Sequence, residues 1–566
     1  MARDVFTYIV GGKAGEGVKK AGTVAANMQA SMGLNVFQMD DYPSLISGGH
    51  NFSVVTSSER EVRSHYMSAE VVVALDERSY RTHACHVAPG GVMVFNSDAV
   101  SEGEGLGVPM TSLASEYPNA ALRVGVAGLA SLCALSGRTR EQMADTIARE
   151  YRHDLENNTA YADAVYDHVR NATDLRFELG GTDASRGGSG DGRTDAASGL
   201  PMFTGNEAMA LGAAAAGLDM YIGYPMTPAS TVLHYLAKHD RELGVTVVHP
   251  ESEIAVANMA IGAAAAGAKV MVGTSGGGFA LMEEAFSFAG MAEVPFLSVM
   301  SSRPGPSTGV PTYTEQADLR FALGQGHGDF PRVVASPGSV AEAFALAAEL
   351  MALVWDFQAA GLLLTEKHLS ESRTTVELDV NGATWAQGVT HEGGDYRRYL
   401  ETDDGVSPML FPPSNELIKW SSYEHDEAGI TTEDAEAIAA MHDKRDRKGA
   451  ALTDRLREMR TVNRFGDDGP LILTYGSTTL SVLEALAAGD IDARVVQPVY
   501  LEPFPVWEFQ ELRDEDAIVV EQSSTGQFAT LMSERAGVGV SDVILRYDGR
   551  PFEPVELAED IRKAIG

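Results

Sequence analysis

The sequence predicts an α/β protein with several domains, and three observations support this prediction. The chain has 566 residues, whereas a single hydrophobic core rarely grows beyond about 250–300 residues. In three parts of the chain, short runs rich in β-branched residues alternate with alanine-rich, helix-like stretches, a pattern typical of mostly parallel sheets covered by helices. A glycine- and serine-rich segment and a long polar segment separate these parts, so we expect domain boundaries there.

The first predicted domain, 1–178, begins with the strand pattern FTYIV and continues into the turn GGKAGEGV. Further strand patterns are NVFQM, VVVALD and VMVF, which indicate a Rossmann-like fold with a mostly parallel sheet. Gly12, Gly15 and Gly17 lie between the first strand and the next helix, where backbone N–H groups can hold a phosphate. Such a turn alone is weak evidence for a dinucleotide site, and no acidic residue ends a clear second strand at the expected offset.

The segment 179–200 is expected to be a flexible linker, because it has low complexity and is rich in glycine, serine and aspartate. Residues 190–192 read Gly-Asp-Gly, which resembles part of a metal–diphosphate signature. The asparagines that such a signature needs downstream are absent, so we predict no metal site in this chain.

The second predicted domain, 201–376, carries four polar loops at short intervals between apolar segments. Parallel α/β enzymes place ligand-binding groups on such loops. One acid, Glu253, one arginine, Arg303, and several threonines arrive on these loops, which indicates a site for a polar, anionic ligand. The loops read YPMTPAS (224–230), HPESE (249–253), TSGGG (274–278) and SSRPGPSTGVPT (301–312).

The remaining third of the chain divides into two parts. From 377 to 465 the pattern becomes polar, which predicts an extended connector ending in a charged helix. From 466 to 566 strand patterns return in PLILTYG, ARVVQPV and AIVVEQ, with helix-like stretches between them. We therefore expect a small third α/β domain at the end of the chain.

The charge balance is strongly acidic, with 79 acidic against 43 basic residues and a formal net charge of −36. Such an excess argues against nucleic-acid binding, which uses basic faces. We interpret the charge as a solvated surface adapted to high salt, where screening shortens repulsion. An acidic face that docks a basic partner is the alternative.

The apolar segments and the cysteines restrict the class of protein further. No apolar stretch approaches the roughly 20 residues of a membrane span, and the N-terminus lacks a signal-peptide pattern, so we expect a cytoplasmic protein without membrane contact. The two cysteines, Cys85 and Cys133, form no CxxC pair. A disulfide scaffold, a four-cysteine zinc site and an iron–sulfur cluster carried by this chain alone are therefore not expected.

The order and spacing of the motifs resemble the α subunit of the 2-oxoacid:ferredoxin oxidoreductase family, in the 2-oxoglutarate synthase type with the γ domain fused at the N-terminus. The resemblance covers nearly the whole chain, and each of its motifs would be weak alone. The motifs are GGKAGEGV, DYPSLISGGH, GNEAMALGA, YPMTPAS, PESEIAVANMAIGAA, TSGGGFALMEEA, GPSTGVPTYTEQADL, GHGDFPR, YRRY, DGVSP, EHDE, MHDKRDRK and VEQSSTGQ.

The resemblance implies oxidative decarboxylation of a 2-oxoacid, with coenzyme A as co-substrate and ferredoxin as electron acceptor. It implies a γ domain that handles coenzyme A, a thiamine-diphosphate pyrimidine-binding domain and a transketolase C-terminal-like domain. Thiamine diphosphate would be shared with a separate β subunit, which carries the Mg²⁺ and diphosphate site and a [4Fe–4S] cluster. The expected assembly is a dimer of heterodimers.

By this resemblance Glu253 is the carboxyl group that hydrogen-bonds the thiamine pyrimidine, which favours the reactive tautomer in a dry pocket. Thr227 and Thr312 are expected to direct hydroxyl groups at the substrate, and Arg303 to pair with its carboxylate, which a guanidinium matches bidentately. Pro225, Gly276 and Gly277 are expected to border the cofactor. Gly277 departs from the family motif TSGPG, in which proline takes this position.

Each of these residues has a structural alternative. Glu253 could be an ordinary acid at a helix N-terminus with Ser252 as the cap. Thr227 could be a plain turn residue, and Arg303 a surface arginine on a glycine- and proline-rich loop.

Other motif residues carry weaker predictions. SGGH (47–50) departs from the commoner family version with arginine before the glycines, so its anion contact is uncertain. We interpret His50 and His327 as structural histidines, and Gln527 as a helix-start residue near a subunit contact.

Alternative functions and substrates stay open at this point. We favour 2-oxoglutarate as the substrate, with pyruvate or a branched-chain oxoacid as the alternative. A divergent, non-catalytic subunit that binds acyl-CoA or another anion is the second hypothesis. The presence of Thr227, Glu253 and Arg303 together favours the enzyme. A dehydrogenase that acts alone with a nicotinamide cofactor is a distant third.

Overall fold

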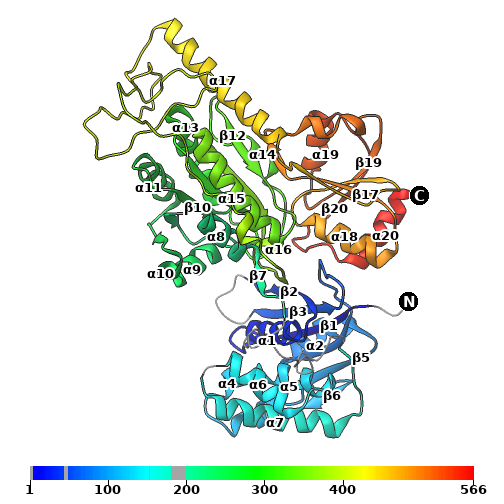
Figure 1. Ribbon diagram of the computed structural model, residues 1–566. Helices are drawn as coiled ribbons and strands as arrows, with labels where there is room; N and C mark the ends of the chain where they lie inside the picture. Colours follow the sequence, from blue (N-terminus) through cyan, green and yellow to red (C-terminus); the bar gives the residue numbers. More distant parts are fainter. Residues whose placement is uncertain (1–3, 44–48, 152, 180–198) are drawn as a thin grey trace, which may run out of the picture. The chain divides into compact units, whose positions relative to one another are not determined.

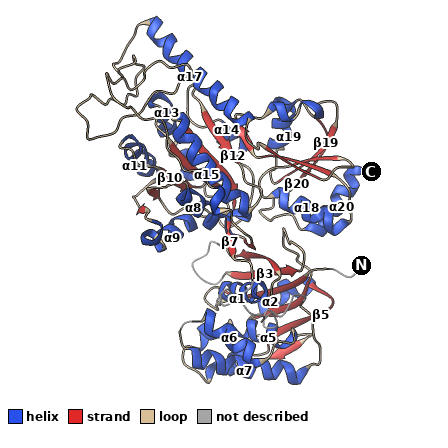
Figure 2. Ribbon diagram, in the orientation of Figure 1, coloured by secondary structure: helices blue, strands red, loops and turns tan. Residues whose placement is uncertain are grey.

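A computed structural model describes residues 4–43, 49–151, 153–179 and 199–566 and contains three β-sheets flanked by helices (Figure 1, Figure 2). The chain forms two compact units, which are described separately below. The first comprises Met1–Phe203, Ser372–Glu377 and Glu553–Val555, and the second comprises Thr204–Glu371, Leu378–Phe552 and Glu556–Gly566. The α/β class is confirmed. The predicted linker falls almost wholly on residues 180–198, which lie outside the described residues.

The first unit contains an eight-stranded sheet with the order β6-β5-β4-β1-β3-β2-β14-β7. β1, β4, β5 and β6 run parallel and include three of the predicted strand patterns. By contrast, β3 is antiparallel to both β1 and β2, and β14 is antiparallel to β2. The strands are β1 Phe6–Lys13, β2 Asn35–Asp41, β3 His50–Ser58, β4 Ala69–Ala74, β5 Val87–Asn96, β6 Leu106–Val108, β7 Met202–Thr204 and β14 Arg373–Thr375.

The expectation of a mostly parallel sheet is therefore wrong for one half of this sheet. The connection from β2 to β3 is shorter than the dozen or more residues that a parallel crossover needs, so the chain returns antiparallel.

The helices of the first unit supply the core against which this sheet packs. α5 is buried along its whole length, because its sequence VAGLASLCAL offers no charged face. It packs against α1 and α7. The helices are α1 Val18–Ser31, α2 Glu77–His83, α3 Met110–Ser115, α4 Ala120–Arg123, α5 Val126–Leu135, α6 Arg140–Glu150 and α7 Leu155–Ala172, with a 3₁₀ turn at Ala84–His86.

The second unit begins with a seven-stranded sheet of order β18-β12-β13-β11-β10-β8-β9, in which all strands but the edge strand β18 run parallel. The strands are β8 Met220–Gly223, β9 Thr246–Val248, β10 Val270–Thr274, β11 Phe296–Ser302, β12 Arg332–Ala335, β13 Ala360–Glu366 and β18 Tyr500–Glu502. The helices are α8 Gly205–Ala215, α9 Ser230–Lys238, α10 Asp240–Leu243, α11 Glu253–Ala265, α12 Gly276–Ala280, α13 Glu283–Ala292, α14 Leu319–Leu323, α15 Val340–Phe357 and α16 Lys367–Glu371.

The alanine- and glycine-rich helices of this part pack closely, as their composition predicts. α8 packs against α15, and a Cβ atom at Gly212 would overlap the carbonyl oxygen of Phe344. Along the described residues, we find no helix whose length and apolar character would let it cross a membrane.

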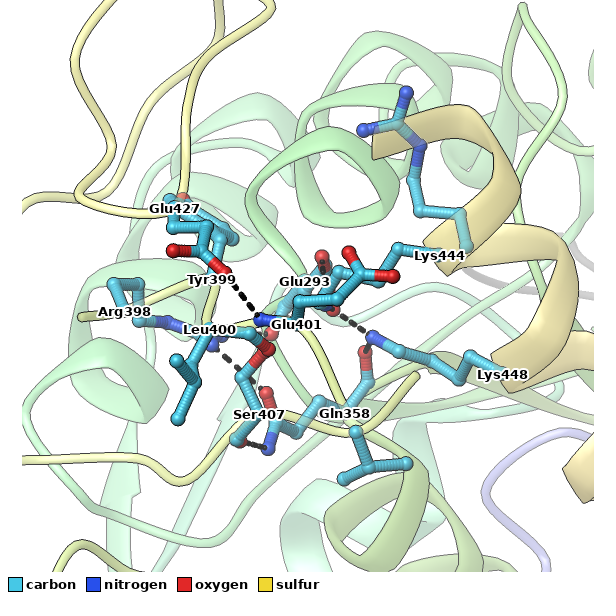
Figure 3. Close-up of polar contacts among 12 residues, drawn as sticks. Glu293, Gln358, Arg398, Tyr399, Leu400, Glu401, Ser407, Glu427, Lys444 and Lys448 are labelled. Carbon is cyan, nitrogen blue, oxygen red and sulfur yellow. Dashed lines mark hydrogen bonds and ion pairs between the residues drawn. The ribbon is translucent and has the colours of Figure 1, made fainter. Parts of the chain in front are cut away.

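The polar connector of the second unit is mostly irregular until α17 (Ala435–Arg457), and buried charges attach it to the rest of the unit. Lys444 Nζ lies 2.8 Å from Glu293 Oε1, and Lys448 pairs with the same carboxylate (Figure 3). Arg398 donates to the Glu293 carbonyl oxygen at 2.6 Å and to Gln358 Oε1 at 2.9 Å. Burial lowers the pKa of Lys448 to about 7. The charged helix is thus held by an acid at the end of α13.

The end of the second unit forms a five-stranded sheet of order β15-β17-β16-β19-β20, parallel except for β15. Its strands are β15 Val462–Phe465, β16 Leu471–Leu473, β17 Arg494–Pro498, β19 Asp516–Glu521 and β20 Gly539–Leu545. Its helices are α18 Thr478–Gly489, α19 Gln527–Leu531, which continues into a π-helical turn at Met532–Ala536, and α20 Pro554–Ile565.

Candidate functional site

The four polar loops predicted from the sequence leave the carboxyl ends of four parallel strands. They follow β8, β9, β10 and β11, which are consecutive neighbours in the order β11-β10-β8-β9. Carboxyl ends of parallel strands lie at one edge of the sheet, where α/β proteins bind ligands. The fold therefore brings the side chains that these loops carry to the same edge.

Glu253 is the first residue of α11 and is buried, with 3% of its surface exposed. Ser252 caps the helix, because its hydroxyl accepts a hydrogen bond from the backbone N–H of Ala255. Glu253 Oε1 is buried and has no hydrogen-bond partner among the described residues. An acid that served only the helix dipole would be solvated, as the exposed neighbour Glu251 is. Glu253 instead has a buried carboxyl oxygen that no described residue satisfies.

Gly278, in the short helix α12, faces Glu253. A Cβ atom at position 278 would lie 2.6 Å from Glu253 Oε1 and closer still to Thr274 Oγ1, so only glycine fits. A Cβ atom at Gly276 would lie 2.6 Å from Asp318 Oδ2. Gly277 is exposed, and a Cβ atom there would meet only the Ser307 carbonyl oxygen at 3.9 Å. The missing proline of the family motif thus leaves open space rather than a changed contact.

Arg303 and Thr227 lie together. Arg303 Nη1 donates to the Thr227 carbonyl oxygen at 2.8 Å, which fixes the guanidinium beside the β8 loop. Burial lowers the pKa of Arg303, and the nearby Asp318 opposes this effect. Asp318 accepts a hydrogen bond from Ser302 at 2.8 Å, and burial raises the pKa of its carboxyl group. Arg303 is half-buried and held in place, unlike a free surface arginine.

Thr312 and Pro225 complete the set of candidate residues in the second unit. Thr312 is 4% exposed, and its Oγ1 has no hydrogen-bond partner among the described residues. Pro225 is exposed at the beginning of the β8 loop. Besides the Glu253 oxygen, a buried, unsatisfied hydroxyl therefore lies near the end of the loop that begins with Arg303.

The sequence reasoning grouped Gly278 with Gly276 and Gly277 as glycines that let backbone approach the cofactor, but it did not predict that Gly278 faces Glu253. It missed the role of Asp318, which lies within the motif GPSTGVPTYTEQADL. Its contacts with Ser302 and Arg303 depend on how the chain folds back after the loop.

The glycine-rich turn lies in the first unit. Gly15 and Gly17 have positive φ values of 96° and 78°, and Gly17 caps α1 without an acidic residue in the first turn of that helix. Glu16 Oε2 accepts a hydrogen bond from the Lys13 backbone N–H at 2.7 Å and would lie 2.7 Å from a Cβ atom at Gly12. This N–H group is therefore already satisfied by the turn's own carboxylate.

His50 lies in a chain of three imidazoles in the first unit. Its Nε2 is 3.0 Å from His83 Nε2, and His83 Nδ1 is 3.1 Å from His86 Nδ1. Burial, with smaller contributions from His50 and His86, lowers the pKa of His83 to about 3, so this imidazole is neutral. Residues 47 and 48 of the SGGH motif lie outside the described residues.

His327 and Gln527 lie in the second unit. The side chain of His327 is exposed, and its backbone N–H donates to Ser287 Oγ at 2.6 Å. Gln527 is the first residue of α19, which confirms its predicted place at a helix start.

Comparison with known proteins identifies the family. Family models described as "Pyruvate ferredoxin/flavodoxin oxidoreductase" and "Pyruvate flavodoxin/ferredoxin oxidoreductase, thiamine diP-bdg" match residues 7–168 and 211–444. The 2-oxoacid:ferredoxin oxidoreductase 2, subunit alpha, of Aeropyrum pernix is 30% identical over 99% of this chain and 98% of its own length. The chain belongs to the 2-oxoacid:ferredoxin oxidoreductase family.

Two further members of the 2-oxoacid:ferredoxin oxidoreductase family are similar to the chain. The structure of 2-oxoglutarate:ferredoxin oxidoreductase from Magnetococcus marinus, with 2-oxoglutarate, coenzyme A and succinyl-CoA bound, is 27% identical, has a TM-score of 0.89 and covers 100% of both chains. The 2-oxoglutarate synthase subunit KorA of Archaeoglobus fulgidus is 31% identical over 58% of this chain and 89% of its own length. The family and the oxidoreductase class predicted from the motifs are confirmed.

Proposed function

We propose that the chain is the α subunit of a thiamine-diphosphate-dependent 2-oxoacid:ferredoxin oxidoreductase that converts a 2-oxoacid and coenzyme A to acyl-CoA, CO₂ and reduced ferredoxin. The observation that carries this proposal is the buried Glu253 carboxylate, which has an unsatisfied oxygen opposite Gly278. Glu253 Oε1 lacks a hydrogen-bond partner among the described residues, and position 278, which faces it, has no side chain. Both features fit a polar heterocycle. Thiamine diphosphate, when bound, supplies the nucleophilic carbon and the electron sink that decarboxylation of a 2-oxoacid requires.

The residues of this chain have distinct roles in the proposal. Glu253 holds a hydrogen bond to the pyrimidine ring in a site that excludes water, where such a contact is stronger than in solvent. Gly276 and Gly277 let the cofactor approach the backbone of α12. Arg303 binds a substrate carboxylate, and the hydroxyls of Thr227 and Thr312 donate to substrate oxygens. Glycines 12, 15 and 17 are proposed as the contribution of the first unit to coenzyme A binding.

The partner subunit is the second part of the proposal. Two cysteines cannot ligate a [4Fe–4S] cluster, which needs four thiolates. We therefore assign the cluster, the Mg²⁺ and the diphosphate site to a β subunit, in a cytoplasmic dimer of heterodimers that reduces ferredoxin. The alpha-subunit names of the relatives support a complex of several subunits.

We propose 2-oxoglutarate as the substrate. An arginine suits the distal carboxylate of this dianion, and the similar Magnetococcus marinus structure contains 2-oxoglutarate. The test is to co-purify the chain with its β partner and to measure CoA-dependent viologen reduction with 2-oxoglutarate, pyruvate and 2-oxoisovalerate, and then ferredoxin reduction. The highest kcat/KM is expected with 2-oxoglutarate. Preference for another oxoacid would reassign the substrate, and no turnover with any oxoacid would refute the enzyme.

The role of Glu253 is tested with a matched pair of variants. Glu253→Gln should lower turnover by at least about 10²-fold while the complex remains assembled, because the amide cannot support the pyrimidine tautomer. Glu251→Gln, two residues earlier and exposed, should leave turnover unchanged. Near-normal activity of Glu253→Gln would move the role to another residue.

A further inference from the structure

The segment that follows the Arg303–Thr312 loop is hydrogen-bonded to the C-terminal α/β part of the second unit. Gln316, four residues after Thr312, is 2% exposed. Its Nε2 donates to the Tyr475 carbonyl oxygen at 2.9 Å. Its Oε1 accepts from Thr478 Oγ1 and from the Gln522 backbone N–H, each at 2.9 Å. Both acceptor positions of the amide oxygen are thus used by groups far along the chain, one at the start of α18 and one just after β19.

Gln527 makes the reciprocal contact from the C-terminal side. Its Nε2 donates to the Ala317 carbonyl oxygen at 2.6 Å, and its Oε1 accepts from the Arg320 backbone N–H at 3.0 Å. The backbone adds a bond from the Gln316 N–H to the Gln522 carbonyl oxygen at 2.6 Å. Two glutamine side chains, one from each side, therefore fix residues 316–320. We call this pair the glutamine latch.

The other end of the loop is held more lightly. Arg303 contacts the Thr227 carbonyl, and the Val310 N–H bonds the Pro304 carbonyl at 3.0 Å. Residues 305–310 between them are exposed. Beyond Thr312, the Thr314 N–H donates to the Gly549 carbonyl oxygen and Thr314 Oγ1 accepts from the His368 N–H, each at 3.2 Å. The position of Thr312, whose hydroxyl is unsatisfied, thus depends on Thr314 and on the latch that follows it. Removing a latch side chain would leave buried backbone groups without partners, which the segment can relieve only by moving.

We propose that Gln316 and Gln527 are positioning residues, through which the C-terminal α/β part holds Thr312 and Arg303 in register with the 2-oxoacid. This inference rests on the proposed function of the same loop. Neither glutamine touches the substrate; each acts through the backbone of residues 316–320. A small displacement of groups that bind a substrate is costly to its affinity, which is why such supporting contacts matter.

The first test uses Gln316→Ala and Gln527→Ala in the complete complex. The KM for the oxoacid should rise at least about tenfold, whereas the Kd for thiamine diphosphate should stay within about twofold, because Glu253 and α12 are untouched. Gln510→Ala, an exposed glutamine in the same part of the chain, should change neither constant. The loss of oxoacid-binding free energy in the double variant should be smaller than the sum of the losses in the two single variants, since both residues hold one segment.

The second test is a conservative rescue. In Gln316→Glu, the protonated carboxyl can still donate to the Tyr475 carbonyl oxygen, whereas the ionised form cannot. The KM of this variant should approach that of the wild type at low pH and rise with pH more steeply than the wild-type KM does. If Gln316 served folding alone, the KM for the oxoacid and the affinity for thiamine diphosphate would change together, without this dependence of the KM on pH.

Hydrogen exchange separates the latch from the proposed function. Peptides covering 303–316 should exchange faster in Gln316→Ala than in the wild type, even if no oxoacid supports turnover. Unchanged exchange and an unchanged oxoacid KM would overturn the latch. Parallel losses of oxoacid affinity, thiamine diphosphate affinity and melting temperature would do the same, because they would indicate general destabilisation.

Discussion

At the scale of single residues, three consecutive glycines at the start of α12 differ in the space around them. Gly278 faces the buried Glu253 carboxylate, whereas Gly277 points toward open space. The sequence shows only a run of identical letters. Their different environments arise because a helical turn rotates successive positions by about 100°, so that one faces the acid and its neighbour faces away.

This difference gives a paired prediction. Gly278→Ala should lower turnover at least about tenfold and weaken thiamine diphosphate binding, because the added methyl group displaces Glu253 or Thr274. Gly277→Ala should weaken thiamine diphosphate binding far less, because its added methyl group meets no protein atom closer than 3.9 Å. It should also raise the melting temperature slightly, since alanine is favoured over glycine in a helix by about 0.5–1 kcal/mol. Titration of the cofactor and thermal melts of both variants are the measurements. Equal behaviour of the two variants would show that Gly278 does not border the acid as described.

The sequence was enough to predict that Thr227, Glu253 and Arg303 lie at one edge of the sheet. It was not enough to predict the residues that hold their loops in place. The three residues follow the parallel strands β8, β9 and β11 of one sheet, and local strand and loop patterns are enough to bring such positions to one edge. Asp318, Gln316 and Gln527 depend on partners far away in the chain, which no local pattern reveals. The antiparallel turn of β3 in the first unit was missed for a related reason, because a short loop between strands decides the direction.

At the scale of elements, α17 shows how a helix with a polar sequence packs through buried ion pairs. The polar sequence predicts a connector that ends in a charged helix, and Lys444 and Lys448 of this helix are buried. They are buried because Glu293, at the end of α13, lies where both amino groups can reach it (Figure 3). Burial alone would raise the pKa of Glu293, but Lys448, Lys444 and Arg398 outweigh it and hold the pKa well below its usual range.

Removal of this carboxylate should destabilise the docking of α17. Glu293→Gln leaves two buried lysines without their acid, a change that costs about 3–5 kcal/mol in comparable buried pairs. Glu458→Gln, which breaks only the exposed pair with Arg455, should cost less than about 0.5 kcal/mol. Denaturant melts of the complex, with peptides of α17 followed by hydrogen exchange, measure both effects.

The difference in stability between the wild type and Glu293→Gln should also depend on pH, with a defined sign. The folded pKa of Glu293 lies below the usual 4.5, so its contribution to stability is present above about pH 4.5 and is lost as the pH falls further. Lys448 beside this carboxylate takes up its proton near pH 7, and without the carboxylate it does so only at lower pH, so the stability gap between wild type and Glu293→Gln should widen as the pH falls through about 7. The gap should then shrink below about pH 4.5, where Glu293 is protonated. A gap that kept widening below pH 4.5 would contradict the ionised state of Glu293.

At the scale of the whole molecule, the dominant property is the charge of −36 on 566 residues. Repulsion among exposed carboxylates opposes the compact state, and its range is the Debye length, about 8–10 Å near physiological salt and about 3 Å at 1 M. The buried pairs of α17 are screened much less, because solvent ions do not enter between them. Added salt should thus weaken the repulsion among exposed carboxylates without weakening the buried ion pairs of α17.

We therefore expect the melting temperature to rise by several degrees between 0.1 and 1 M KCl, as screening removes repulsion that the folded surface concentrates. Sucrose serves as the control, because it strengthens burial without screening charge. A variant with six exposed acids neutralised should melt higher at low salt and show a smaller slope with KCl; the six are Glu392, Asp403, Glu433, Asp467, Glu511 and Asp514. Equal slopes for the variant and the wild type would place the salt effect outside surface repulsion. An equal gain from sucrose would assign it to hydration of the apolar surface instead.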